Sequence, residues 1–196
     1  AVLDTSELNT QILEARAARD VARAELDKVL AGASEEEIKV YETAVENAEI
    51  TLNNAQNDLD RDYKDALNTL NDAYLKFYNA FNAVDSIQRT YFGGNDQESI
   101  QVKENEDKIE RAMNLAKFYL DIAKNDSTSE NIDTALSEMK DSLDESYEAL
   151  STVRGICETA AYRGTVSAAG KTSLDNHKSY INTALTNINT AQSNLD

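Results

Sequence analysis

Hydrophobic residues recur every three or four positions along most of this chain, a spacing that places them on one face of an α-helix. The longest run extends from Ser34 to Tyr91 and contains neither glycine nor proline. Its first half has the spacing of a coiled-coil seam, at Ile38, Tyr41, Val45, Ala48, Leu52, Ala55 and Leu59. Its second half continues with Tyr63, Ala66, Leu70, Ala73, Phe77, Ala80, Val84, Ile87 and Tyr91. We therefore predict one continuous helix of roughly 85 Å, at 1.5 Å per residue.

The spacing changes where the two halves of this helix meet. A step of four residues from Ala55 to Leu59 is followed by another from Leu59 to Tyr63. Such an interval relaxes a left-handed supercoil, so the helix is expected to straighten or to change partners near Asp60. We therefore divide the chain into a coiled-coil hairpin at 1–59 and an antiparallel helical bundle at 60–196.

Four shorter helices complete the prediction. The first runs from Thr5 to Leu30, and the others begin after Asn95, after Ser127 and at Thr172. The segment 154–171 contains three glycines, and we expect a long irregular connection there with one short helical turn. The predicted fold is all-α and elongated, with about five helices, one of double length. The bundle is expected to contain three or four helices.

The break between the first helix and the long helix contains Gly32. Glycine readily adopts the left-handed conformation that ends a helix, and Ser34 with Glu37 has the spacing of a capping box. Two arrangements fit this pattern. The chain either reverses at Gly32 to form an antiparallel hairpin, or bends there and continues in the same direction as a long stalk.

Composition narrows the classes of function. The chain has 36 acidic and 19 basic residues, and its formal net charge of −17 repels nucleic-acid phosphates and anionic lipid surfaces. No apolar run approaches the roughly 20 residues of a membrane-spanning helix. We therefore expect neither nucleic-acid binding nor direct membrane insertion. Because the chain begins with Ala1 rather than Met and ends within a helical pattern, we expect it to be a piece of a longer protein.

Residue types that commonly carry catalysis are few and isolated. The single histidine, His177, falls in the apolar register of the last helix, which favours a packing role. The single cysteine, Cys157, has Glu158 beside it and no second cysteine to pair with. Nothing in the local sequence favours a thiolate, so we interpret it as a structural thiol. Four acidic residues imitate the spacing of a calcium loop: Asp58, Asp60, Asp62 and Asp65. They lack the loop's glycine and lie in a helical pattern, so a solvated helix face is expected. We predict a protein that is not an enzyme and uses no cofactor, metal or small-molecule substrate.

Aromatic residues are concentrated in the second half of the long helix, and most of them are expected to form the core of the bundle. Tyr74, Tyr78 and Phe92 lie off the predicted seam, and Arg89 and Tyr91 lie near the end of the helix. Aromatic and arginine side chains are enriched at protein–protein interfaces. We therefore take these five as candidate protein-binding residues. Packing inside the bundle, and pairing of Arg89 with a carboxylate, are the alternatives.

The first third of the chain resembles a known family. The sequence LDTSEL at 3–8 leads into an alanine-rich helix, which is followed by LAGASEEEI at 30–38. This order resembles HlyD-type membrane fusion proteins, the periplasmic adaptors of efflux and secretion systems, over residues 3–59. In that family a leucine and aspartate start leads from a lipoyl-like domain into a long α-helical hairpin. The resemblance implies that this chain is the hairpin with an enlarged helical insertion.

The resemblance also implies a role. Members of that family bridge an inner-membrane transporter and the outer parts of an export machine, as rings of protomers without chemistry of their own. The implied partners are therefore an inner-membrane transporter and further copies of the chain. The implied location is periplasmic or extracytoplasmic, with membrane association through parts outside this segment. The alternative is an extracytoplasmic helical-bundle sensor or adhesin-like binding module in which the long helix is a spacer.

Overall fold

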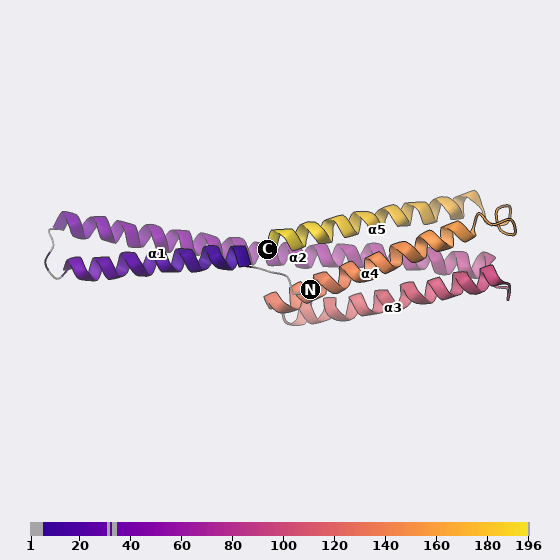
Figure 1. Ribbon diagram of the computed structural model, residues 1–196, viewed down its shortest axis with the longest axis horizontal. Coiled ribbons are helices and arrows are strands. Elements are labelled where there is room, and N and C mark those ends of the chain that lie inside the picture. The colour runs from indigo at the N-terminus through magenta and orange to yellow at the C-terminus, as the bar shows by residue number, and fades with distance from the viewer. Residues whose placement is uncertain (1–5, 31, 33–34, 196) are drawn as a thin grey trace. The chain divides into compact units, whose positions relative to one another are not determined.

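The computed structural model describes residues 6–30, 32 and 35–195 (Figure 1). Within these residues there are five helices and no strand: α1 (Ser6–Leu30), α2 (Glu35–Tyr91), α3 (Gln97–Asn125), α4 (Ser129–Ile156) and α5 (Ala168–Leu195). The predicted all-α fold is confirmed, and α2 is the expected helix of double length. The predicted start at Thr5 and the predicted cap at Ser34 lie outside the described residues.

Two helices begin one residue later than the sequence pattern predicts. Asp96 caps α3, because its carboxylate accepts a hydrogen bond from the Ser99 amide at 2.9 Å. Thr128 caps α4, because its hydroxyl oxygen accepts from the Asn131 amide at 3.3 Å. In both places two polar residues that favour N-caps are adjacent, so hydrophobic spacing does not distinguish them.

The last helix begins four residues before the predicted start at Thr172. The hydroxyl of Ser167 accepts a hydrogen bond from the Gly170 amide at 3.1 Å, which satisfies an amide of the first turn. This turn consists of Ala168, Ala169 and Gly170 and carries no large apolar side chain. The hydrophobic pattern therefore starts one turn later than the helix does.

The chain divides into two compact units, and α2 contributes to both. One unit consists of the described residues as far as Lys64, which we call the hairpin unit, together with Asn194 and Leu195. The other unit is Asp65–Ser193, which we call the bundle unit. The sequence pattern places the boundary at 59 and 60, close to this division.

In the hairpin unit, α1 and the first part of α2 lie antiparallel and side by side (Figure 1). Ile12 and Ala15 of α1 pack with Leu52 of α2. A continuous rod would hold residues 12 and 52 roughly 60 Å apart, at 1.5 Å per residue. The chain therefore reverses between the two helices, and the bent-stalk arrangement at Gly32 is wrong.

The bundle unit contains four helices: the second part of α2, then α3, α4 and α5 (Figure 1). Its core includes large side chains without solvent exposure, such as Leu70 and Phe77. The predicted seam of α4 is buried at every position: Ile132, Leu136, Met139, Leu143, Ser146, Leu150 and Val153. Of the two predicted sizes, the four-helix bundle is confirmed.

Candidate functional site

The five predicted binding residues do not form one surface. Tyr74 and Tyr78 lie one turn apart on α2, and Tyr74 is half-buried. Tyr78 is 45% exposed, and its neighbour Leu75 is 57% exposed. This part of α2 is therefore the accessible portion of the predicted site.

Arg89 lies on the solvent side of α2, and its charge is already paired. Its Nε donates a hydrogen bond to Oδ1 of Asp85 at 2.7 Å, one turn earlier on the same helix. This bond raises the pKa of the guanidinium group further above its ordinary value. Pairing with a carboxylate, the alternative for this arginine, fits the geometry.

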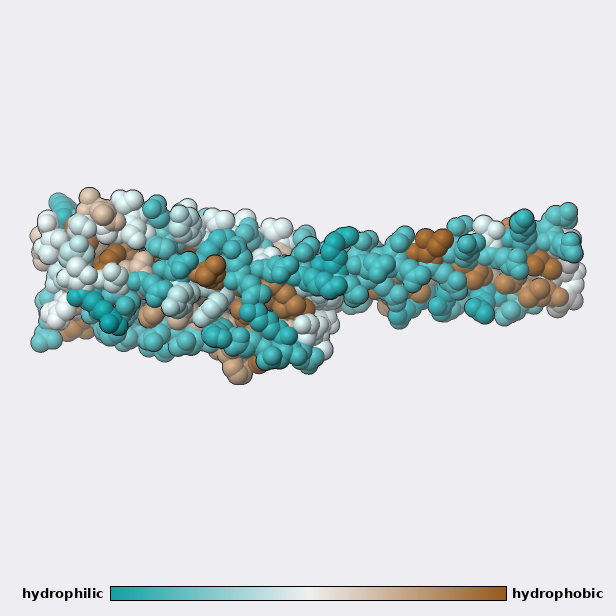
Figure 2. Space-filling view, turned by 180° about the vertical axis from the view of Figure 1, so that it is seen from behind, coloured by the Kyte–Doolittle hydropathy of each residue, from teal (hydrophilic) through white to brown (hydrophobic). Residues whose placement is uncertain are grey.

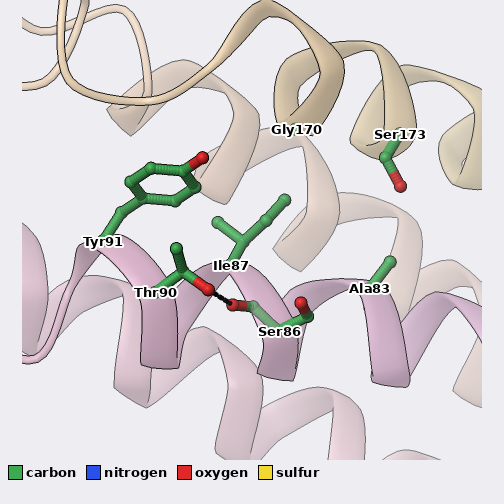
Figure 3. Close-up of a pocket in the computed structure, with 7 residues that line it drawn as sticks. All are labelled: Ala83, Ser86, Ile87, Thr90, Tyr91, Gly170 and Ser173. Atoms are coloured by element: carbon green, nitrogen blue, oxygen red, sulfur yellow. Dashed lines mark hydrogen bonds between the residues drawn. The ribbon is translucent and has the colours of Figure 1, made fainter.

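Tyr91 lines a small open cavity between α2 and α5 (Figure 3). The cavity has a volume of about 210 Å³, and Figure 3 shows Ile87 pointing into it from α2 with Ser173 opposite on α5. A Cβ atom added to Gly170 would lie 3.8 Å from Cε2 of Tyr91 and 3.4 Å from Oγ of Ser167. The hydroxyl of Thr90, which also lines the cavity, donates a hydrogen bond to the Ser86 carbonyl on the same helix at 2.6 Å.

The structure does not place Phe92 on the predicted binding surface. Its side chain is only 1% exposed, and its ring stacks on that of Tyr162, with centroids 4.3 Å apart and an interplanar angle of 30°. The expectation that Phe92 belongs to an exposed patch is therefore wrong. The residue follows the last residue of α2, outside the helical register, so its position relative to the seam did not indicate its environment.

Tyr162 is the residue that the sequence pattern missed. It lies in the connection between α4 and α5, and its hydroxyl donates to Oδ2 of Asp96 at 2.8 Å and lies 3.0 Å from Oγ of Ser99. The Ser99 amide and then the Tyr162 hydroxyl lower the pKa of Asp96. One signal was available, because Tyr162 is the sole aromatic residue between Arg154 and Lys171. It joins the α4–α5 connection to the turn between α2 and α3.

Glu158 holds the rest of this connection in place. Its carboxylate lies 2.7 Å from Arg154, 3.3 Å from Lys171 and 3.7 Å from Arg163. Arg154 and then Lys171 lower the pKa of Glu158. Backbone hydrogen bonds, such as the one from the Tyr162 amide to the Thr159 carbonyl at 3.2 Å, form successive turns instead of the single helical turn that was expected.

The isolated residues with catalytic potential occupy structural positions. Cys157 is buried after the end of α4, and burial raises the pKa of its thiol. His177 is half-buried on α5, where burial lowers its pKa, and its ring lies edge-on to Tyr180 at 5.7 Å. Both residues fit the expected packing roles.

The acidic series Asp58, Asp60, Asp62 and Asp65 lies on α2, as the helical pattern predicted. Arg61 pairs with Asp58 at 2.9 Å and approaches Asp62 at 3.8 Å. Across the part of the chain that the structure describes, no group of three or more His, Cys, Asp or Glu side chains is placed to hold a metal ion.

The surface is predominantly polar. On the face shown in Figure 2, hydrophilic residues cover most of the molecule, and hydrophobic residues lie in small separate groups. Exposed apolar side chains occur on both units, including Val40 at 65% in the hairpin unit and Phe118 at 58% in the bundle unit. None of the helices in the described ranges is both long enough and apolar enough to cross a membrane.

No protein-family model, curated protein or solved structure matches this chain. The geometry above defines a helical hairpin unit and a four-helix bundle unit. The resemblance of residues 3–59 to membrane fusion proteins therefore remains a hypothesis.

Proposed function

We propose that this chain is a non-enzymatic helical module that mediates protein–protein assembly, and that it serves as the hairpin region of a periplasmic membrane fusion protein. The observation that carries the proposal is the antiparallel pairing of α1 with the first part of α2. This pairing brings Ile12 and Ala15 against Leu52. The segment that resembles the family by sequence therefore also has the hairpin that the resemblance implies.

The two units have different roles in this proposal. The hairpin unit is the spacer and assembly element of the adaptor, and it presents exposed side chains such as Leu13 and Val40 to solvent. The bundle unit is an insertion that adds a second binding surface, with Leu75 and Tyr78 exposed on α2. The expected partners are an inner-membrane transporter and further copies of the chain, in a periplasmic or extracytoplasmic location.

Site-specific photocrosslinking in the native host tests this proposal. A photoreactive phenylalanine analogue is placed at Val40, which is 65% exposed, and at Tyr78, which is 45% exposed. The adaptor assignment predicts crosslinks to a transporter subunit and to a second copy of the chain, identified by mass spectrometry. A matched analogue at Val84, which is 0% exposed, is expected to give neither. Crosslinks to neither a transporter nor another copy would contradict the assignment.

One observation favours the alternative of an extracytoplasmic sensor or adhesin-like module. The bundle unit has the α2–α5 cavity of about 210 Å³, lined partly by the side chains of Ser86, Tyr91 and Ser173 (Figure 3). A ligand-binding role places the functional surface there instead of on the hairpin unit. In the crosslinking experiment, this alternative predicts products with an external ligand or surface component and none with a transporter.

A further inference from the structure

The open cavity between α2 and α5 lies within the bundle unit and has a volume of about 210 Å³ (Figure 3). Ala83 and Ser86 line it from α2, and Gly170 and Ser173 line it from α5. These side chains are too short to fill the space between the two helices. Figure 3 shows Ser173 pointing from α5 towards α2. The cavity is therefore a space that both helices enclose.

Three hydroxyl groups at this cavity have no partner in the protein. Within the described ranges, no hydrogen bond joins the hydroxyls of Ser86, Tyr91 and Ser173 to another residue. Other hydroxyls of α2 donate to the carbonyl four residues earlier on the helix, namely those of Thr43, Thr51, Thr69 and Thr90. The three hydroxyls at the cavity are therefore free to donate hydrogen bonds to a bound molecule and to accept them from it.

The cavity is electrically neutral, although the chain has a net charge of −17. Among the described residues, no charged side chain lines it. The charged residues next to it in sequence are paired with other groups, Arg89 with Asp85 at 2.7 Å and Lys171 with Glu158 at 3.3 Å. A charged ligand would lose hydration in this cavity without gaining an opposite charge. The ligand that fits is therefore uncharged.

The lining also offers apolar surface beside the free hydroxyls. Ile87 points from α2 into the cavity, and the half-buried ring of Tyr91 lies one turn further along the same helix (Figure 3). The volume is below the roughly 300–1,000 Å³ of sites for drug-sized ligands. A matching ligand is therefore small and has both hydroxyl groups and C–H faces. A pyranose sugar has this combination.

We propose that the α2–α5 cavity is a binding site for an uncharged monosaccharide, a hexopyranose. The hydroxyls of Ser86 and Ser173 form hydrogen bonds with the sugar hydroxyls, and Ile87 and the ring of Tyr91 contact its C–H surface. This inference does not rest on the proposed assembly function, because the whole site lies within the bundle unit. It is tested with the purified chain, so its failure leaves the crosslinking test of assembly unaffected.

Titration of the intact chain with D-glucose, D-galactose and D-mannose, followed by NMR of the backbone amides, tests the site. At least one of these sugars is expected to give saturable shifts at residues 86–91 and 170–173. The expected dissociation constant is on the order of 1 mM, because a ligand of about 12 non-hydrogen atoms has limited affinity. Glycerol, which lacks the ring, is expected to give no saturable shift at the same concentration. Saturation with none of the three sugars, or equal saturation with glycerol, would overturn the proposal.

Replacing both serines locates the binding. The double variant Ser86→Ala, Ser173→Ala removes two hydroxyls and is expected to weaken binding about tenfold, because each lost hydrogen bond lowers the affinity. The matched control is Ser179→Ala, at an exposed position of α5 outside the cavity, which is expected to bind as the wild-type chain does. Ser173→Leu fills the cavity and is expected to abolish binding, which provides a second result if the double variant fails to fold. Equal affinity of the wild-type chain and the cavity variants would contradict the site.

Discussion

Phe92 and Tyr78, two aromatic residues in the second part of α2 or just after it, have very different solvent exposure. Both were candidates for an exposed binding surface, yet Phe92 is 1% exposed and Tyr78 is 45% exposed. Phe92 fills a space beneath Tyr162 at the turn after α2. Tyr78 remains available to a partner.

Replacement by alanine distinguishes the buried side chain of Phe92 from the exposed side chain of Tyr78. Phe92→Ala is expected to lower the free energy of unfolding by about 3–5 kcal/mol, because it removes a buried ring and leaves a cavity. Tyr78→Ala is expected to change it by about 1 kcal/mol or less, since much of that side chain already contacts water. Urea unfolding followed by circular dichroism measures both. Equal losses would contradict the assignment of Phe92 to the core.

The hydroxyl of Tyr162 has a separate effect on Asp96. Because the pKa of Asp96 is lowered in the fold, its hydrogen bonds contribute stability above the ordinary Asp pKa of about 3.9. That stability is lost as the pH falls through the lowered value. Tyr162→Phe is expected to raise the pKa of Asp96 towards its ordinary value, because the ring stays stacked while the donor is removed.

An NMR titration of the Asp96 carboxyl carbon measures this change. The control is Tyr180→Phe, at a tyrosine that is 49% exposed on α5 and contacts His177. It should leave the Asp96 titration unchanged. If Tyr162→Phe also left it unchanged, the hydrogen bond from the Tyr162 hydroxyl to Asp96 would be absent in solution.

At residue level, hydrophobic spacing predicted the core better than it predicted the candidate site. It placed Ser146 in the seam of α4 despite its polar side chain, and Ser146 is buried. It did not predict that Glu106 is buried beside Lys103, because a charged residue interrupts an apolar pattern. Tyr162 was missed because its contacts join segments far apart in sequence.

At the scale of single elements, the hairpin unit depends on a narrow seam. Its buried apolar side chains among the described residues are Ile12, Ala15, Ala22 and Leu52. Other seam positions, such as Tyr41 and Val45, are only half-buried. Two helices enclose less apolar area than four, so each fully buried position matters more to this pairing.

Leu52→Asp tests the seam directly. Leu52 is 7% exposed, and its replacement is expected to destabilise the pairing of α1 and α2 by at least the roughly 2–5 kcal/mol of a buried Leu→Ala change. A buried carboxylate without a cation adds to that loss. Ile50→Asp, at a position that is 50% exposed on the same helix, is the matched control. Hydrogen exchange of α1 should rise in the first variant only, and equal exchange in both would contradict the seam.

Helix boundaries were less predictable than the helices themselves. The seam pattern identified all five helices, because long helices repeat their apolar spacing many times. The start of α5 was missed, because Ala168 and Gly170 carry no apolar signal and the Ser167 cap acts locally. The boundary between the units was approximated by the change of spacing near Leu59, whereas the contacts divide the chain after Lys64.

At the scale of the whole molecule, one chain combines two units with cores of different depth. The bundle unit buries large residues such as Leu70, Phe77 and Leu150 completely. Among the described residues as far as Lys64, no side chain of that size is fully buried. The helices of the hairpin unit are therefore held together by less buried apolar area than those of the bundle unit.

This difference predicts unequal local stability. Amides of α1 are expected to exchange at least about tenfold faster than those in the middle of α4, because separating α1 from α2 exposes little apolar area. Native-state hydrogen exchange with mass spectrometry measures both helices in one experiment. Equal protection of α1 and α4 would show that the chain opens as one cooperative unit and would contradict the division.

The central claim of this account is that the chain folds back after α1, since the hairpin carries the proposed function. Electron spin resonance measures it through labels attached to cysteines at Ser6 and Asn57, both exposed, in a chain in which the buried Cys157 is replaced by alanine. The folded-back hairpin predicts a distance of roughly 10–20 Å between the labels, set by two packed helices. A distance of about 75 Å, the length of a continuous helix between these positions, would contradict it.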